Sequence, residues 1–210
     1  IAVSGFALSF CNAVCSLGAT FLLPLYFQFM RGVSASASGA LLMPFLLAFV
    51  VFSYVGGSTA RRLGRTKRLM AAAALITAIG LLLMAMAEED TSHYLTTLYV
   101  IIVGAGIGLI QPCITMTVQN AVETRDLGVA TSGTLLFRMI GGAFGATMVG
   151  AIVTVRFNAL TGSHATLGTL RADAVALSGA DHALASGFHF AFLGCAAISI
   201  VGFLIAIAAN

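Results

Sequence analysis

The stretch LMAAAALITAIGLLLMAMA, residues 69–87, decides the fold class of this chain. It carries no charge, and Thr77 is its only polar side chain. A helix needs about 20 mostly apolar residues to cross a hydrocarbon core about 30 Å thick. This stretch is therefore long enough to span a membrane as a single helix.

The rest of the chain has the same character. Its 210 residues are 60% hydrophobic and 8% charged, whereas a soluble domain carries about 25% charged residues. A β-barrel would show segments of about 10 residues with alternating polarity, which these runs lack. We expect an all-α membrane protein, a single six-helix transmembrane bundle over residues 1–210. Its spans lie near residues 4–30, 37–59, 69–87, 95–120, 129–155 and 187–209.

The basic residues predict the orientation of the bundle. Five of the ten Lys and Arg residues lie within positions 61–68, in GGSTARRLGRTKRL (56–69). Short loops rich in Lys and Arg stay on the cytoplasmic side of a membrane. By alternation, both ends of the chain are cytoplasmic and residues 158–186 form an extracytoplasmic loop.

The basic loop allows two interpretations. Its cations can anchor the chain on anionic lipid headgroups. Alternatively, Gly57 permits close approach to a neighbouring helix and Gly64 permits a tight turn. A rigid turn with fixed cations would then lock one conformation of a moving protein and release another.

Polar side chains recur at matching places in the two halves of the chain. The span 4–30 carries one set and the span 95–120 another, each at i, i+4 and i+8 and hence on one helix face. The spans 69–87 and 187–209 offer little beyond Thr77 and Ser199, which suits contact with lipid. This pattern predicts two inverted three-helix repeats, as in many secondary transporters. The residues expected to line a substrate cavity are Asn12, Ser16, Thr20, Gln111, Thr115 and Gln119.

Two prolines occupy comparable positions in these spans, Pro24 and Pro112. A proline removes a backbone N–H and bends a helix, and interrupted helices at matching places point to a transport site. The alternative is that Ser and Thr bond back to their own helix and that prolines are common in spans. That alternative explains the hydroxyls better than it explains two glutamines and an asparagine at membrane depth.

The span 129–155 combines small residues with one charge. Gly141 and Gly145 form a G-x-x-x-G pair, which predicts close contact with another helix. Arg138 lies inside the span, where an arginine costs about 2.5–3.5 kcal/mol unless it finds a partner or water. It either faces protein or a wet cavity, or extends toward the cytoplasm.

Other site classes find no support in the sequence. The four cysteines lie inside spans without C-x-x-C spacing or a neighbouring histidine, and the four histidines are scattered. The glycines at 104, 106 and 108 lack the preceding strand of a nucleotide-binding loop. We expect no enzyme, no metal site, no cofactor and no nucleic-acid partner.

Three stretches carry a family resemblance: LPLYFQFMRGVSASASGALLMPF (23–45), TVQNAVETRDLGVATSGTLLFRMIGGAFG (117–145) and GGSTARRLGRTKRL (56–69). The first resembles the passage between the ninth and tenth spans of fourteen-span drug:proton antiporters of the major facilitator superfamily, the EmrB/QacA type. The second resembles their loop from the twelfth span into the thirteenth. The third resembles the cytoplasmic G-x-x-x-D-R-x-G-R motif of the superfamily. The chain thus resembles the C-terminal half of such a transporter.

The resemblance implies roles for particular residues. The loop motif falls on Gly57, Arg62, Gly64 and Arg65, which in the family help govern exchange between inward-open and outward-open states. Arg61 occupies the acidic position of the motif, which removes a carboxylate that the family uses. The resemblance also implies that the spans 4–30 and 95–120 line the central cavity, while 69–87 and 187–209 lie outermost.

The resemblance further implies a function. The bundle would work by alternating access with a missing N-terminal helical bundle of the same protein, in the cytoplasmic membrane of a bacterium. A small amphiphilic or cationic substrate would leave as protons enter, with the proton gradient as the energy source. The carboxylates of this chain lie in or beside loops, so we expect the coupling carboxylate in the absent half. The alternatives are another major facilitator transporter (for a sugar, organic acid or siderophore) and a non-transporting helical membrane subunit or orphan fragment.

Overall fold

The computed structural model describes residues 2–63, 66–87, 91–162, 164–166, 168, 170 and 180–208. The helices are α1 (Ala2–Met30), α2 (Ala35–Leu41), α3 (Met43–Leu63), α4 (Thr66–Ala85), α5 (His93–Asn120), α6 (Leu127–Thr161) and α8 (Ala180–Ala208), with a short 3-10 turn, η1 (Thr124–Asp126). Among the described residues, six helical segments are long and apolar enough to cross a membrane, α2 and α3 together making one. The all-α, six-span prediction is therefore confirmed.

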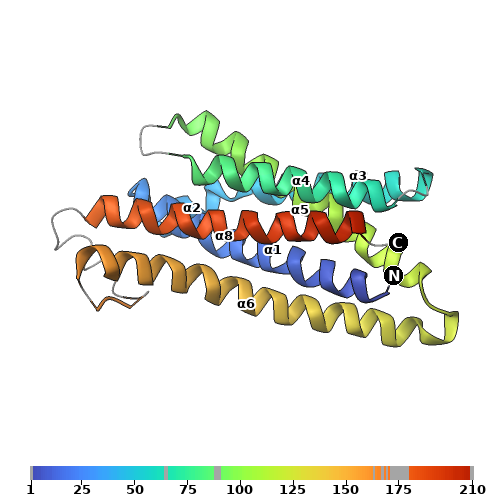
Figure 1. Cartoon of the computed structure of the whole chain (residues 1–210). Coiled ribbons are helices and arrows are strands. Elements are labelled where there is room, and N and C mark those ends of the chain that lie inside the picture. The colour runs from blue at the N-terminus through green and yellow to red at the C-terminus, as the bar shows by residue number, and fades with distance from the viewer. Residues whose placement is uncertain are drawn as a thin grey trace.

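The helices run side by side along one direction (Figure 1). Both chain termini lie at one end of the bundle, together with the C-terminal end of α3 and the connection from α5 to α6. The ends of α4 and α6 and the start of α8 lie at the opposite end. This arrangement brings the basic cluster and both termini to the same end, as alternation of the spans requires.

The first three spans are α1, the α2 and α3 pair, and α4, and the last three are α5, α6 and α8. Helices of one set pack mainly on helices of the other. α1 packs along α6, and α5 packs along α3, so the first helix of each set contacts the second helix of the other. The third helices, α4 and α8, pack on each other and also on α5 and α1. Two sets related by a pseudo-two-fold axis would produce this exchange.

Glycines allow two of these helix pairs to approach closely. A Cβ atom on Gly141 of α6 would lie 2.6 Å from the backbone oxygen of Phe10 in α1. A Cβ atom on Gly104 of α5 would lie 2.5 Å from the backbone oxygen of Phe45 in α3. Only a residue without a side chain fits at such a separation. The close contact predicted from the G-x-x-x-G pair is thus made with α1.

The second span is interrupted at Leu42, between α2 and α3. Pro44, in the first turn of α3, has no N–H to donate to the preceding turn. The buried Ser38 ties α2 to α1, because its hydroxyl oxygen accepts a hydrogen bond from Gln28 Nε2 at 3.0 Å. In contrast, α1 and α5 continue as α-helix through Pro24 and Pro112. The bends expected at those two prolines stay a prediction.

Two helices extend into the stretch that the sequence assigned to the loop 158–186. α6 continues to Thr161, and α8 begins at Ala180. The residue that follows α6 is Gly162, whose φ of +68° is readily adopted by glycine. Its N–H donates to the Asn158 carbonyl at 2.9 Å. A helix can extend beyond the hydrocarbon core because it satisfies its own backbone hydrogen bonds.

α4 and α8, the helices expected to lie outermost, turn their few polar side chains inward. Thr77 is 3% exposed and Ser199 is 5% exposed, whereas Ile79 and Ile200 are 45% and 41% exposed. The Ser199 hydroxyl donates to the Ala74 carbonyl at 2.9 Å, which ties α8 to α4. Contact of their exposed apolar faces with lipid stays a prediction.

Candidate functional site: a polar cavity on α1, α5 and α6

The two polar stripes meet at the centre of the bundle. Asn12 Nδ2 of α1 donates a hydrogen bond to Gln111 Oε1 of α5 at 2.8 Å. Asn12 lies on α1 between Leu8 and Cys15, which belong to two separate buried apolar clusters. The amide pair therefore joins the two central helices at the level where the apolar core is divided.

Two neighbouring cavities open beside this pair. One has a volume of about 280 Å³ and lies between α1, α3, α5 and α6, and the other, of about 140 Å³, lies between α5 and α6. Gln111, Leu135 and Arg138 line both. Because they share these walls, we treat them as one site, called here the central cavity. Ligand sites of transporters and enzymes commonly measure about 300–1,000 Å³.

Most of the residues predicted from the stripes lie in its walls. Ser16 lines the larger part, and Thr115 and Gln119 line the smaller part. Asn12 lies behind Gln111, is 8% exposed, and lines a separate internal space of about 10 Å³. Thr20 donates to the Ser16 carbonyl of its own helix at 2.7 Å. Thr115 likewise donates to the Gln111 carbonyl of its own helix at 3.3 Å. Back-bonding thus accounts for two hydroxyls, whereas the amides of Asn12 and Gln111 pair between helices.

Arg138 is the charge of the central cavity. It is exposed in this chain, and among the described residues no hydrogen-bond acceptor or carboxylate partner is found for it. It follows Leu127, the first residue of α6, by eleven positions, which is about 17 Å along a helix axis. That is about half of a 30 Å hydrocarbon core. Of the two interpretations offered for Arg138, its place in the cavity wall favours the wet cavity.

Residues 2–146 match the family model of the Major Facilitator Superfamily, which is well over half of the chain. The chain belongs to the Major Facilitator Superfamily. Its members are transporters, so this chain is part of a transporter and not an enzyme.

Named relatives of this facilitator bundle are much longer than it. It is 33% identical to the uncharacterized MFS-type transporter Rv1877 of Mycobacterium tuberculosis over 95% of this chain and 31% of that protein. It is 35% identical to the multidrug transporter protein MdtP of Bacillus subtilis over 71% of this chain and 27% of that protein. The chain therefore spans less than a third of the length of these relatives.

Solved structures show the same fold. PepTSo2 superposes with a TM-score of 0.72 over 99% of this chain and 39% of that chain, at 22% identity. The proton:xylose symporter XylE superposes with a TM-score of 0.63 over 100% of this chain and 43% of that chain, at 18% identity. The six helices thus adopt the arrangement found within larger facilitator structures.

The facilitator loop motif lies partly within a helix. Gly57 belongs to α3, where a Cβ atom would lie 3.5 Å from the Cβ atom of Pro112. Arg62 is exposed in the last turn of α3. Gly64 and Arg65 lie outside the described residues. The gating role of these four residues stays a prediction.

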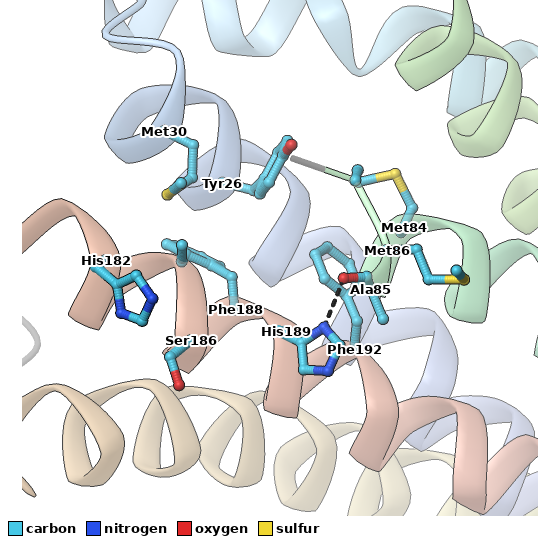
Figure 2. Close-up of a pocket in the computed structure, with 12 residues that line it drawn as sticks. Tyr26, Met30, Met84, Ala85, Met86, His182, Ser186, Phe188, His189 and Phe192 are labelled. Carbon is cyan, nitrogen blue, oxygen red and sulfur yellow. Dashed lines mark hydrogen bonds between the residues drawn. The ribbon is translucent and has the colours of Figure 1, made fainter. Parts of the chain in front are cut away.

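A larger cavity of the facilitator bundle, about 770 Å³, was not predicted from the sequence. It lies between α1, the end of α4 and α8, and Figure 2 shows Tyr26, Phe188 and Phe192 among the side chains that line it. His189 Nδ1 lies 2.7 Å from the Ala85 carbonyl oxygen at the end of α4. The histidines appeared scattered along the sequence. The spacing of two of them offered a signal, because His182 and His189 share one face of α8 with Ser186 between them.

Proposed function

We propose that this chain is the C-terminal six-helix bundle of a proton-coupled multidrug efflux transporter of the fourteen-span EmrB/QacA type. The observation that carries the proposal is the central cavity, because amides, hydroxyls and one cation from α1, α5 and α6 gather in it at membrane depth. α4 and α8 contact each other, α5 and α1, and neither helix lines the central cavity. This supports a cavity on the face that meets the rest of the transporter.

The names of several relatives support drug export. MdtP is called a multidrug transporter. A tetracycline resistance determinant of Streptomyces rimosus is 31% identical over 70% of this chain and 42% of that protein. The MFS-type efflux transporter pyiT of Pyricularia grisea is 29% identical over 72% of this chain. We infer that the substrate of this chain is a small amphiphilic or cationic compound.

The proposed mechanism is alternating access. The bundle rocks as one body against the rest of the protein, and its close glycine contacts keep α1 against α6 and α3 against α5 during the motion. Ser16, Gln111 and Gln119 contact the substrate from this side. Each proton that moves inward releases about 2.3 kcal/mol of free energy per 100 mV of membrane potential.

We place the proton-carrying carboxylate in the rest of the transporter. A proton carrier needs a titratable group at membrane depth. Among the acidic side chains that the structure describes, Glu123 and Asp126 lie in the connection from α5 to α6. Both are exposed beside Arg125, at 3.2 and 3.7 Å. Neither has the position of a carrier within a span.

The proposal is tested with the full-length protein in a bacterial host that lacks its own drug exporters. We expect efflux of a cationic dye such as ethidium that stops when a protonophore collapses the gradient. Gln111→Ala and Gln119→Ala should reduce the efflux rate several-fold, whereas Ile79→Ala, on the lipid-facing side of α4, should not. A well-expressed protein that moves a sugar or an organic acid, and no dye of any charge, would favour the alternative transporter class.

A further inference from the structure

Arg138 differs from Arg31 and Arg156, two other arginines beside or within the helices. Arg156 Cζ lies 4.0 Å from the centre of the Phe190 ring, so its cation is held by an aromatic face. Arg31 donates to the Thr91 carbonyl and to Thr96 Oγ1. Within the part of the chain that the structure describes, Arg138 alone among these three has no such partner.

The neighbours of Arg138 in the central cavity do not supply a negative charge. They are apolar residues, amides, threonines and Ser16. The threonine hydroxyl hydrogens are already used within the helices: Thr131 donates to the Leu127 carbonyl at 2.7 Å and Thr134 to the Ala130 carbonyl at 2.9 Å. A cation at membrane depth is costly without water or a counter-charge. The described neighbours of Arg138 supply no counter-charge, so a carboxylate that pairs with it comes from outside this part of the chain.

Gln111 adds a second donor to the same wall. The Oε1 atom of Gln111 accepts the hydrogen bond from Asn12. The Nε2 amide group of Gln111 is then available to donate into the cavity. The Arg138 guanidinium carries five N–H donors in a planar fork that matches the two oxygens of a carboxylate. A guanidinium and an amide NH₂ on facing helices make a donor set that suits an oxyanion.

We propose that Arg138 and the side-chain amide NH₂ of Gln111 form a subsite that binds a carboxylate group. The carboxylate belongs either to the transported compound or to an Asp or Glu on the membrane-embedded face of the rest of the transporter. This inference deepens the proposed function and rests on it in one respect, namely that the central cavity faces the rest of the transporter. It extends the substrate class from cations to amphiphiles that bear a carboxylate, or it gives the missing carboxylate a partner.

The first experiment measures binding to the purified full-length protein by equilibrium dialysis with radiolabelled 2-naphthoate and its neutral isostere 2-naphthamide. If the substrate supplies the carboxylate, the wild-type protein binds naphthoate at least tenfold more tightly than naphthamide. Arg138→Gln abolishes the preference, and Arg138→Lys retains part of it, because a lysine keeps the charge but loses the fork. Arg156→Gln, on the same helix, leaves the preference unchanged. The Lys variant keeps the test valid should the Gln variant fold poorly.

The second experiment covers the other source of the carboxylate. In that case the wild-type protein shows no preference for naphthoate, and Arg138→Glu loses transport by placing two carboxylates together. Second-site revertants of Arg138→Glu then replace an Asp or Glu outside residues 1–210 with a neutral or basic residue. Revertants of Arg156→Glu do not fall at that position. The carboxylate subsite is overturned if naphthoate has no preference, no such revertant arises, and Arg138→Gln transports as well as Arg156→Gln.

Failure of this subsite and failure of the proposed function are distinguishable. The equilibrium-dialysis experiment measures binding and does not depend on transport. A protein that exports no dye can therefore still show or lack the preference for naphthoate. Conversely, dye efflux that depends on Gln119, together with no preference for naphthoate, no charge-changing revertant of Arg138→Glu and full transport by Arg138→Gln, would support the exporter and overturn the subsite.

Discussion

The hydrogen bond between Asn12 and Gln111 is the contact on which the geometry of the central cavity depends. Asn12 is 8% exposed, and its amide reaches across to α5 at 2.8 Å. Removing one partner leaves the other amide buried with an unused polar group, which is more costly than losing both. The pair should therefore couple α1 to α5 energetically as well as geometrically.

A double-mutant cycle tests that coupling. We expect Asn12→Ala and Gln111→Ala each to lower the free energy of unfolding by about 1–2 kcal/mol, with a coupling energy of about 0.6–1.7 kcal/mol for the pair. The measurement is unfolding of the purified full-length protein by SDS titration. Thr20→Ala is the control, because its hydroxyl bonds only within α1. Strictly additive single changes would show that the amides do not interact in the membrane protein.

For individual residues, the sequence predicted which side chains share one face of a helix. It did not predict which side chains of different helices contact each other. The i, i+4, i+8 spacing is a property of one helix, so Ser16 and Gln119 could be assigned to the cavity wall directly. The pairing of residue 12 with residue 111 depends on how far α1 is shifted along α5, which the spacing does not encode. The same holds for Thr77, which was expected to face lipid with the rest of its helix and is 3% exposed.

Between helices, the glycine contacts set the separation of α1 from α6 and of α3 from α5. Backbone oxygens rather than side-chain ends lie opposite Gly141 and Gly104, so a neighbour cannot move aside by changing a rotamer. The bundle can then move as one body only while these contacts are kept. Substitutions here should affect stability before they affect substrate recognition.

Gly141→Ala should lower the free energy of unfolding by about 1–3 kcal/mol, because the added methyl group would lie 2.6 Å from the Phe10 carbonyl oxygen. Gly128→Ala in the same helix has open space around it and should be neutral or stabilising by up to about 1 kcal/mol. SDS unfolding of the two variants side by side gives the comparison. Equal effects at both positions would contradict the close approach of α6 to α1.

The existence of the six spans was predictable, whereas their interruptions and ends were not. Long apolar runs can cross lipid only as helices. The break at Leu42 arises at Pro44, a proline that gave no signal distinct from Pro24 or Pro112 in the sequence. The extension of α6 to Thr161 lies in a polar stretch, where hydropathy does not separate helix from loop.

For the whole molecule, the proposed function requires one face of the bundle to meet lipid and another to meet the rest of the transporter. α4 and α8 present exposed apolar residues, including Ile79 and Ile200. The central cavity lies on α1, α5 and α6. A bundle with one such face lacks half of its cavity, so its activity should depend on the remaining part of the protein.

Residues 1–210 expressed alone should therefore insert in the membrane and fail to drive proton-coupled efflux. The reason is that neither the opposite cavity wall nor the coupling carboxylate is expected in this chain. Dye efflux in proteoliposomes with an imposed pH gradient measures this, with the full-length protein as the positive control. Protonophore-sensitive efflux by the 210-residue chain alone would contradict the assignment of the carboxylate to the absent part.

The most direct test of the account is cysteine accessibility in the full-length protein, because its central claim is that the polar faces of α1 and α5 line a water-filled path. All native cysteines are replaced, including the four in residues 1–210, and single cysteines are placed at Ser16, Thr115 and Gln119 and, as controls, at Ile79 and Ile200. A water-soluble cationic thiosulfonate should modify the first three at least tenfold faster than the controls, which should react with a lipid-soluble maleimide instead. Fast aqueous labelling at 79 and 200 with no labelling at 16, 115 and 119 would contradict it.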